Sequence, residues 1–297
     1  MTTIEIFAPA KVNLTLHITG QRADGYHLLD SLVGFAGVGD VLRITPDGAG
    51  DFTVTGPEAG DVPTGGANFV SDVADVFWTG APLSFSLEKN LPVAAGIGGG
   101  SADAAACFRG LAYLNGADTA PSAQAMARLL AIGADVPMCA ASDTARVQGI
   151  GEAITPLAVW PELPILLVNP RVAVPTGPVF KALTKKDNPP MEALPADMAD
   201  LPAVFDWLAR QRNDLEPPAQ AIAPQIARVL DAIATTSGCR AARMSGSGAT
   251  CFGLYESDAM AAAAAAHLRA EHPHWWVQAT RLNGARRAAP QLIRATT

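Results

Sequence analysis

Four glycines fall within five positions of this sequence, at Gly96 and from Gly98 to Gly100. Glycine loses more conformational freedom on folding than any other residue, so such a cluster indicates a backbone that needs positive φ angles or a very close approach. The cluster lies between a strand-like and a helix-like pattern, and a helix N-terminus presents unpaired N–H groups that bind anions. The string from Pro92 to Ala105 therefore predicts a phosphate-binding turn, with a glycine hinge as the alternative.

This turn differs from two common nucleotide-binding motifs. No Gly-Lys-Ser/Thr follows it, as in a Walker A loop, and it lacks the third glycine of the dinucleotide-binding fingerprint. Ser101 adds a hydroxyl at the start of the helix predicted from Ser101 to Leu114. We expect backbone N–H groups to hold the phosphates, an arrangement that needs little net positive charge.

Composition excludes several classes of protein. The 21 Lys and Arg residues against 28 Asp and Glu residues give a net charge of −7, which argues against a nucleic-acid coat or a polybasic membrane binder. Hydrophobic residues make up 49% of the chain, too many for a disordered protein. No apolar run approaches the roughly 18 residues of a membrane helix, and the N-terminus lacks a secretory signal pattern. We expect a soluble cytoplasmic protein.

The cysteines and histidines form no metal-ligand pattern. The four cysteines are widely separated, so we expect them to be small buried hydrophobic residues in a reducing compartment. His272 and His274 adjoin a proline and a tryptophan, which favours a surface turn over a metal site.

Apolar periodicity predicts a chain that mixes strands and helices. The strand-like segments are 4–6, 12–18, 41–44, 52–55, 83–87 and 165–168, and a strand, glycine turn and strand span 243–255. The helix-like segments are 69–77, 101–114, 122–131, 202–212, 218–236 and 258–270. The length of 297 residues favours two domains that share a cleft. Three prolines within 155–164 place the junction there, which predicts domains at 1–160 and 161–297.

Lys11 is a lone lysine within an otherwise apolar strand pattern. Lys11 and Asn13 are two positions apart, so in a strand their side chains face the same side. Either the two share a polar site, or the lysine extends along the apolar surface to place its ammonium group in solvent.

Asp135 lies between apolar residues, directly after the helix predicted at 122–131. One interpretation is a turn-capping aspartate. The other is a carboxylate in an apolar pocket near a lysine, able to accept a proton from a substrate hydroxyl, since a nearby cation keeps a carboxylate ionised. A second glycine turn, Met244 to Thr250, is either a tight hairpin or further backbone that lines a phosphate.

The order of these motifs resembles the GHMP kinase superfamily. The strings PAKVNL from Pro9, PVAAGIGGGSADAA from Pro92, GADVP from Gly133 and MSGSGATCFG from Met244 span nearly the whole chain. The resemblance implies an α+β fold of two domains with the active site in the cleft between them. It also implies an ATP-dependent kinase that phosphorylates an alcohol group, with magnesium bridging the β- and γ-phosphates of ATP.

Two further strings narrow the resemblance within the superfamily. The turn from Arg22 to His27 and the string from Arg212 to Glu216 resemble members that phosphorylate the 2-hydroxyl of a cytidyl-diphosphate sugar alcohol, in the methylerythritol phosphate route to isopentenyl diphosphate. Another kinase of the superfamily, acting on homoserine or mevalonate, is the alternative. A non-catalytic nucleotide-binding protein is a third, but it would need neither Lys11 nor Asp135.

The resemblance also implies roles for individual residues. Lys11 and Asp135 correspond to a catalytic pair. The residues implied to bind the substrate are Asn13, Tyr26, His27, Thr176 and Phe180, with Tyr26 and Phe180 on either side of the cytosine. The residues implied to surround the ATP phosphates are Pro92, Val93, Ala94, Ala95, Gly96, Ile97, Gly98, Gly99, Gly100, Ser101 and Ala102. Ala94 and Ala95 stand where the family commonly has glycine, and Ala102 where it has serine, so the magnesium ligands are unknown.

The expected ligands follow from this resemblance. They are ATP, magnesium and a small-molecule substrate, with no nucleic acid and no membrane as partners. We expect a monomer or a weak homodimer.

Overall fold

The computed structural model describes residues 2–46, 49–62, 68–283 and 289–294. The strands are β1 (Thr2–Asn13), β2 (His17–Gln21), β3 (His27–Pro46), β4 (Phe52–Thr55), β5 (Leu83–Glu88), β6 (Ala145–Gly149), β7 (Ala153–Pro156), β8 (Pro164–Asn169), β9 (Cys239–Met244), β10 (Cys251–Tyr255), β11 (Trp276–Arg281) and β12 (Gln291–Arg294). The helices are α1 (Phe69–Phe77), α2 (Gly99–Leu114), α3 (Ala123–Ile132), α4 (Val136–Ala141), α5 (Thr176–Lys181), α6 (Leu201–Arg210), α7 (Glu216–Ile222), α8 (Gln225–Ala234) and α9 (Asp258–Glu271), with a short 3-10 helix at Ala59–Asp61.

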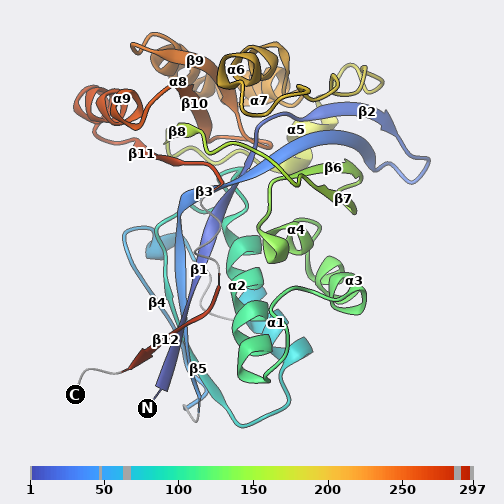
Figure 1. Ribbon diagram of the computed structural model, residues 1–297, viewed down its shortest axis with the longest axis vertical. Helices are drawn as coiled ribbons and strands as arrows, with labels where there is room; N and C mark the ends of the chain where they lie inside the picture. The colour runs from blue at the N-terminus through green and yellow to red at the C-terminus, as the bar shows by residue number, and fades with distance from the viewer. Residues whose placement is uncertain (1, 47–48, 63–67, 284–288, 295–297) are drawn as a thin grey trace.

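The first body of the molecule is a sheet covered by helices on one face. The strands run in the order β12-β1-β3-β5-β4, and β2, β6 and β7 extend the sheet along β3. Figure 1 shows α1 and α2 lying together beside the long strands β1 and β3. Small residues on α2 let it approach the sheet, since a Cβ added at Gly110 would lie 2.6 Å from Ile44 Cδ1. The buried alanines of α2 thus serve a close helix-to-sheet contact.

The second body is built on a four-stranded antiparallel sheet in the order β11-β8-β10-β9. Every residue of β8 is buried, and its run Ile165–Val168 is continuously apolar. Leu166 and Val168 belong to one hydrophobic cluster, and Ile165 and Leu167 belong to another. Both faces of this sheet are therefore covered, which explains an apolar run without alternation.

One of these clusters is shared between the two bodies. Val12 and Leu32, from β1 and β3, pack in the same cluster as Leu167 and Phe252 of the second sheet. The chain also returns from the second body to the first, because β12 pairs antiparallel with β1, and Figure 1 shows these two strands side by side. The domain boundary predicted at residue 160 stays a prediction.

The α+β class is confirmed, and the observed elements correct some sequence-based boundaries. The single helix predicted at 218–236 is wrong: α7 ends at Ile222 and α8 begins at Gln225. Pro224 lies between them, and a proline has no N–H to continue a helix. The strand predicted at 41–44 is the end of a 20-residue strand, β3.

Two expectations from the sequence concern the cysteines and membrane-spanning helices. The four cysteines are free, and Cys107, Cys139 and Cys251 are buried while Cys239 is partly buried. Burial raises the pKa of the Cys107 thiol well above its usual range. Across the ranges that the structure describes, no helix is both long and apolar enough to cross a membrane.

The pairing of β1 with β3 yields a prediction about stability. Gly39 pairs with Pro9, next to a register shift that precedes Lys11, and a Cβ at Gly39 would collide with the backbone of Ala8. We expect Gly39→Ala to lower the free energy of unfolding by about 1–3 kcal/mol, measured by urea denaturation, because backbone atoms must move apart. Gly60→Ala is the control, since nothing lies within 4 Å of its added Cβ. Equal stability of the two variants would contradict the role given to Gly39.

Candidate active site

A cavity of about 1120 Å³ is lined by residues of both bodies. Most of the residues singled out in the sequence line it together, although they come from distant parts of the chain. These are Lys11, Asn13, Tyr26, His27, Ala94, Ala95, Gly96, Gly98, Gly99, Gly100, Ser101, Asp135, Thr176 and Phe180. Ile97 and Ala102 are buried in hydrophobic clusters and line no part of it.

Lys11 points into this cavity from β1 and is almost completely buried, at 5% exposure. Its ammonium group donates hydrogen bonds to Asn13 Oδ1 at 2.9 Å and to Asp135 Oδ2 at 2.8 Å. The alternative of a lysine that reaches solvent is therefore wrong. The same-face relation of Lys11 and Asn13 places both at one polar point of the cavity.

Asp135 lies at the N-terminal end of the short helix α4, where a capping aspartate would bond to backbone N–H groups. Its side chain makes no capping hydrogen bond; its carboxylate instead pairs with the Lys11 ammonium group. The turn-capping alternative is therefore wrong. With 39% of its side chain exposed, the carboxylate is open to a molecule in the cavity.

The first glycine turn passes directly over Lys11. The Lys11 N–H donates to Ile97 O at 2.9 Å, and a Cβ at Gly98 would lie 3.2 Å from Lys11 Cβ. Gly96 and Gly98 have positive φ angles, and so does Ala94, at 52°. Ala94 thus keeps the left-handed backbone of a glycine at a cost of roughly 1–2 kcal/mol. The turn ends at the N-terminus of the 16-residue helix α2.

The second glycine turn packs against the first. Ser245 Oγ donates to Gly96 O at 3.0 Å and accepts a hydrogen bond from the Asn13 N–H at 3.0 Å. A Cβ at Gly96 would lie 2.6 Å from Ser245 O. Asn213, from the string 212–216, donates to Met244 O and Gly246 O at 2.8 Å each. The turn is therefore more than a hairpin, because it supports the wall of the cavity.

Aromatic side chains gather at one end of the cavity. The rings of His27 and Phe180 lie 5.1 Å apart with a 33° tilt, and Tyr26 lines the same space with 62% of its surface exposed. Burial and the neighbouring Lys186 charge lower the pKa of His27. A neutral imidazole is therefore present at neutral pH. Thr176 shares a 2.8 Å hydrogen bond with a serine of the second glycine turn.

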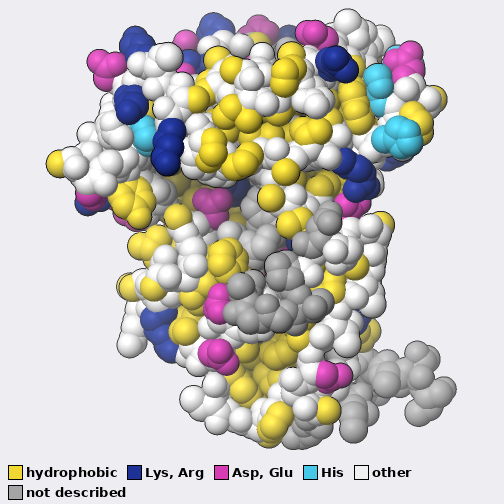
Figure 2. All heavy atoms as spheres, turned by 180° about the vertical axis from the view of Figure 1, so that it is seen from behind, with side chains coloured by type: hydrophobic (Ala, Val, Ile, Leu, Met, Phe, Trp, Pro, Cys, Tyr) yellow, Lys and Arg dark blue, Asp and Glu magenta, His cyan; other side chains and the backbone are white. Residues whose placement is uncertain are grey.

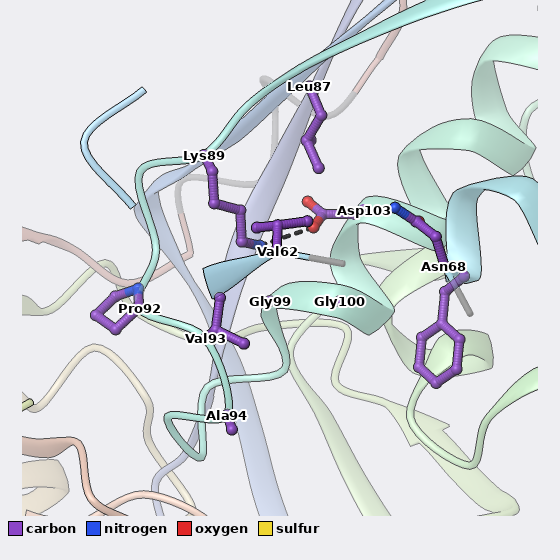
Figure 3. Close-up of a pocket in the computed structure, with 11 residues that line it drawn as sticks. Val62, Asn68, Leu87, Lys89, Pro92, Val93, Ala94, Gly99, Gly100 and Asp103 are labelled. Atoms are coloured by element: carbon purple, nitrogen blue, oxygen red, sulfur yellow. Dashed lines mark hydrogen bonds and ion pairs between the residues drawn. The ribbon is translucent and has the colours of Figure 1, made fainter. Parts of the chain in front are cut away.

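A second, smaller pocket of about 170 Å³ lies on the other side of the glycine turn. Figure 3 shows Lys89 and Asp103 joined by an ion pair, with the apolar side chains of Val62, Leu87 and Val93 nearby. Besides Pro92, Val93 and Ala94, the residues that line it are Val62, Asn68, Phe69, Leu87, Lys89, Gly99, Gly100 and Asp103. It shares Phe69, Ala94, Gly99 and Gly100 with the larger cavity, so the two spaces adjoin at the glycine turn.

Lys89 lies between two buried carboxylates at this pocket. Its ammonium group donates to Asp40 at 2.5 Å and to Asp103 at 2.7 Å. Burial raises the pKa of Asp103 to about 8, and the nearby Asp40 charge adds to that effect although Lys89 opposes it. Among the described residues none donates to Asp103 Oδ1. Two carboxylates therefore compete for one cation.

Sequence reasoning missed this cluster. Lys89 directly follows β5 and Asp40 lies within β3, 49 positions away. The signal that was present is a lysine three residues before Pro92 of the glycine turn, and an aspartate two residues after Ser101. Neither position indicates that the side chains of Lys89, Asp40 and Asp103 meet. No group of three or more His, Cys, Asp or Glu residues suited to a metal ion occurs in the part of the chain that the structure describes.

Comparisons with known proteins show the family of this chain. The family model described as "GHMP kinases N terminal domain" matches residues 68–143, and "GHMP kinases C terminal" matches residues 191–274. The 4-diphosphocytidyl-2-C-methyl-D-erythritol kinase of Roseobacter denitrificans is 52% identical, with 97% of both chains covered. That of Dinoroseobacter shibae is 54% identical, with 92% of this chain and 93% of that protein covered.

A solved structure is similar over the same length. A crystal structure of 4-(cytidine 5'-diphospho)-2C-methyl-D-erythritol kinase has a TM-score of 0.76 at 31% identity, and the match covers 94% of this chain and 99% of that one. The fold, the glycine turns and these matches define a GHMP kinase, an ATP-dependent phosphotransferase. The chain belongs to the family of 4-diphosphocytidyl-2-C-methyl-D-erythritol kinases. The kinase class inferred from the motifs is confirmed.

The buried cluster at the smaller pocket yields a second prediction. Lys89→Met would leave Asp40 and Asp103 buried without their shared cation. Breaking a buried pair in this way costs about 3–5 kcal/mol, and we expect a loss of that size in the free energy of unfolding. Lys181→Met removes an exposed lysine of α5 and should change stability by less than about 0.5 kcal/mol. A Lys89 variant as stable as its control would show that the carboxylates do not depend on this lysine.

Proposed function

We propose that this kinase transfers the γ-phosphoryl group of ATP to the 2-hydroxyl of 4-diphosphocytidyl-2-C-methyl-D-erythritol, in isopentenyl diphosphate biosynthesis by the methylerythritol phosphate route. The observation that carries the proposal is the Lys11–Asp135 pair, located in one cavity between a glycine turn and an aromatic end. The relatives with half their residues identical over nearly the full length bear the name of that kinase.

Asp135 accepts the proton of the substrate hydroxyl in this mechanism. Lys11, 2.8 Å away, offsets negative charge at the attacking oxygen and the γ-phosphate. Phosphoryl transfer asks a protein mainly for positioning and charge stabilisation. Asn13 holds the ammonium group from its other side, so Lys11 has little freedom to turn away.

The ATP phosphates lie at the glycine turn in this proposal. The N-terminus of α2 offers N–H groups and a partial positive charge to an anion. The smaller pocket takes the base of the nucleotide, because it shares residues of the glycine turn with the phosphate site and is lined by apolar residues with a few polar groups.

Magnesium fits the residues that are present. Ser101 lines the same cavity as the turn, and magnesium in phosphoryl-transfer sites is commonly held by few protein groups together with phosphate oxygens. Ser101 is therefore the residue that would hold it, since Asp135 is paired with Lys11. When bound, the ion neutralises charge on the β- and γ-phosphates.

The cytidyl group lies at the aromatic end of the cavity. Tyr26 and Phe180 flank the cytosine in this arrangement, and His27 and Asn13 provide polar contacts, with Thr176 lining the same space. A kinase for homoserine or mevalonate would have no base to stack there. An assay of ATP consumption with a panel of these acceptors separates the two functions.

The remaining alternatives find less support. A non-catalytic nucleotide-binding protein would need no buried lysine paired with a carboxylate. A nucleic-acid binder needs a basic stripe, and on the face seen in Figure 2 the Lys and Arg side chains are scattered among acidic ones. We place the enzyme in the cytoplasm, where free buried cysteines persist, as a monomer or a weak homodimer.

The catalytic role of Asp135 is testable by substitution. Asp135→Asn keeps the shape of the side chain but cannot accept the proton, so we expect kcat to fall about 10²- to 10⁴-fold with binding of a non-hydrolysable ATP analogue retained. Steady-state kinetics and titration calorimetry measure the two effects. Asp143→Asn, at an exposed position nearby in the chain, is the control. Near wild-type turnover of the Asp135 variant would remove this residue from the chemistry.

The aromatic end gives a prediction about substrate affinity. Tyr26→Ala removes one stacking surface, and stacking of a base on an aromatic side chain contributes about 1–3 kcal/mol. We expect the KM for the cytidyl substrate to rise about fivefold or more, with the KM for ATP little changed. Tyr113→Ala removes a partly exposed tyrosine of α2 outside the cavity and should change neither value. An unchanged KM in the Tyr26 variant would place this residue outside the substrate site.

A further inference from the structure

One ion pair joins loops from the two bodies of the molecule. Glu58 lies between β4 and α1 of the first body, and Arg171 lies two residues after the end of β8 of the second. Arg171 Nη1 donates to Glu58 Oε2 at 2.7 Å, and Nη2 donates to Oε1 at 2.6 Å. A two-point pair of this kind fixes orientation as well as distance. Glu58 is only 7% exposed, so its charge relies on this partner.

Arg171 is held in a conformation that costs free energy. Its φ angle is 57°, in the left-handed region that favours glycine, which costs an arginine roughly 1–2 kcal/mol. Its N–H donates to Asn169 Oδ1 at 2.7 Å, and Asn169 Nδ2 donates to Thr250 Oγ1 at 2.9 Å. The strained loop is thus anchored to the second sheet and directs the guanidinium group toward the first body.

Glu58 is anchored to the first body by backbone hydrogen bonds. Its N–H donates to Lys89 O at 3.1 Å, and the Lys89 N–H donates to Thr55 O at 2.7 Å. A Cβ at Gly56 would lie 2.5 Å from Lys89 O, so the loop rests on the backbone of Lys89. The same loop continues to Val62, which lines the smaller pocket together with Lys89.

The loop that carries Arg171 leads to the larger cavity, which the proposed function assigns to the acceptor. Val174, Pro175 and Thr176 follow it and line the larger cavity. The Arg171–Glu58 pair therefore connects a wall of the pocket assigned to the nucleotide base with a wall of the cavity assigned to the acceptor. Neither of its two side chains lines either space.

We propose that Arg171 and Glu58 are positioning residues that couple nucleotide binding to acceptor binding across the cleft. The inference rests on the proposed function, which assigns the two spaces to the two substrates. Each substrate that orders its own wall orders the other wall through the ion pair, so the second substrate binds to a site already formed. By linkage the effect is reciprocal, and couplings between sites are typically about 5- to 150-fold in affinity.

Titration calorimetry with a non-hydrolysable ATP analogue tests the coupling. In the wild type we expect saturating 4-diphosphocytidyl-2-C-methyl-D-erythritol to tighten the binding of the analogue at least about fivefold. The coupling ratio is the affinity for the analogue with the acceptor present divided by the affinity without it. In Glu58→Gln and in Arg171→Gln this ratio should fall to near one. The double variant should behave as either single variant does, since both remove the same interaction.

The control is Arg240→Gln, which disrupts exposed ion pairs with Asp206 and Glu256 inside the second body, and its ratio should equal that of the wild type. Thermal unfolding of each variant checks that the fold persists. Should Glu58→Gln fail to fold, Arg171→Gln, which changes a half-exposed side chain, decides the question alone.

Three results would overturn the inference. They are no coupling in the wild type, a wild-type coupling ratio in Glu58→Gln or Arg171→Gln, or a loss of coupling in the double variant that equals the sum of the two single losses. Failure of the proposed function is seen separately, as absent turnover of the cytidyl substrate by the wild-type enzyme.

Discussion

The two bodies of this kinase meet through a backbone-to-backbone contact between two glycine turns, and the active site depends on it. The Thr250 N–H donates to Ala95 O at 3.1 Å, and Cβ atoms at Gly96 and Gly246 would each lie within 2.8 Å of backbone oxygens of the other turn. A side chain at either position would force the turns apart. Because Asn13 is bonded to the second turn and Lys11 to the first, the catalytic pair is located by the same contact.

Charge is scarce in this chain, at 16% of the residues, and several of the ion pairs lie at the cleft. Lys11 pairs with Asp135, Lys89 lies between two carboxylates, and Arg171 joins the two bodies. Buried pairs contribute little net stability, because the cost of removing charges from water offsets their attraction. Their value in this enzyme is geometric, since each fixes a wall or a reacting group of the site.

Much of the fold and of the candidate site could be predicted from local patterns. The helix after the first glycine turn follows from residue spacing, and the same-face relation of Lys11 and Asn13 follows from the period of a strand. The break at Pro224 was missed because apolar spacing on its two sides continues as if one helix were present. The cluster at Lys89 was missed because Asp40 and Asp103 lie on different elements, and no spacing rule relates a strand residue to a helix residue.

The sequence by itself determined where clustered glycines allow left-handed backbone and where many of the strands and helices lie, since these depend on steric limits and neighbours within a few residues. Only the tertiary structure decided which side chains meet. Lys11 and Asp135 are 124 positions apart, and Glu58 and Arg171 are 113 apart. Such pairs form because buried charges must find partners once apolar surfaces have packed, and that packing is a property of the whole chain.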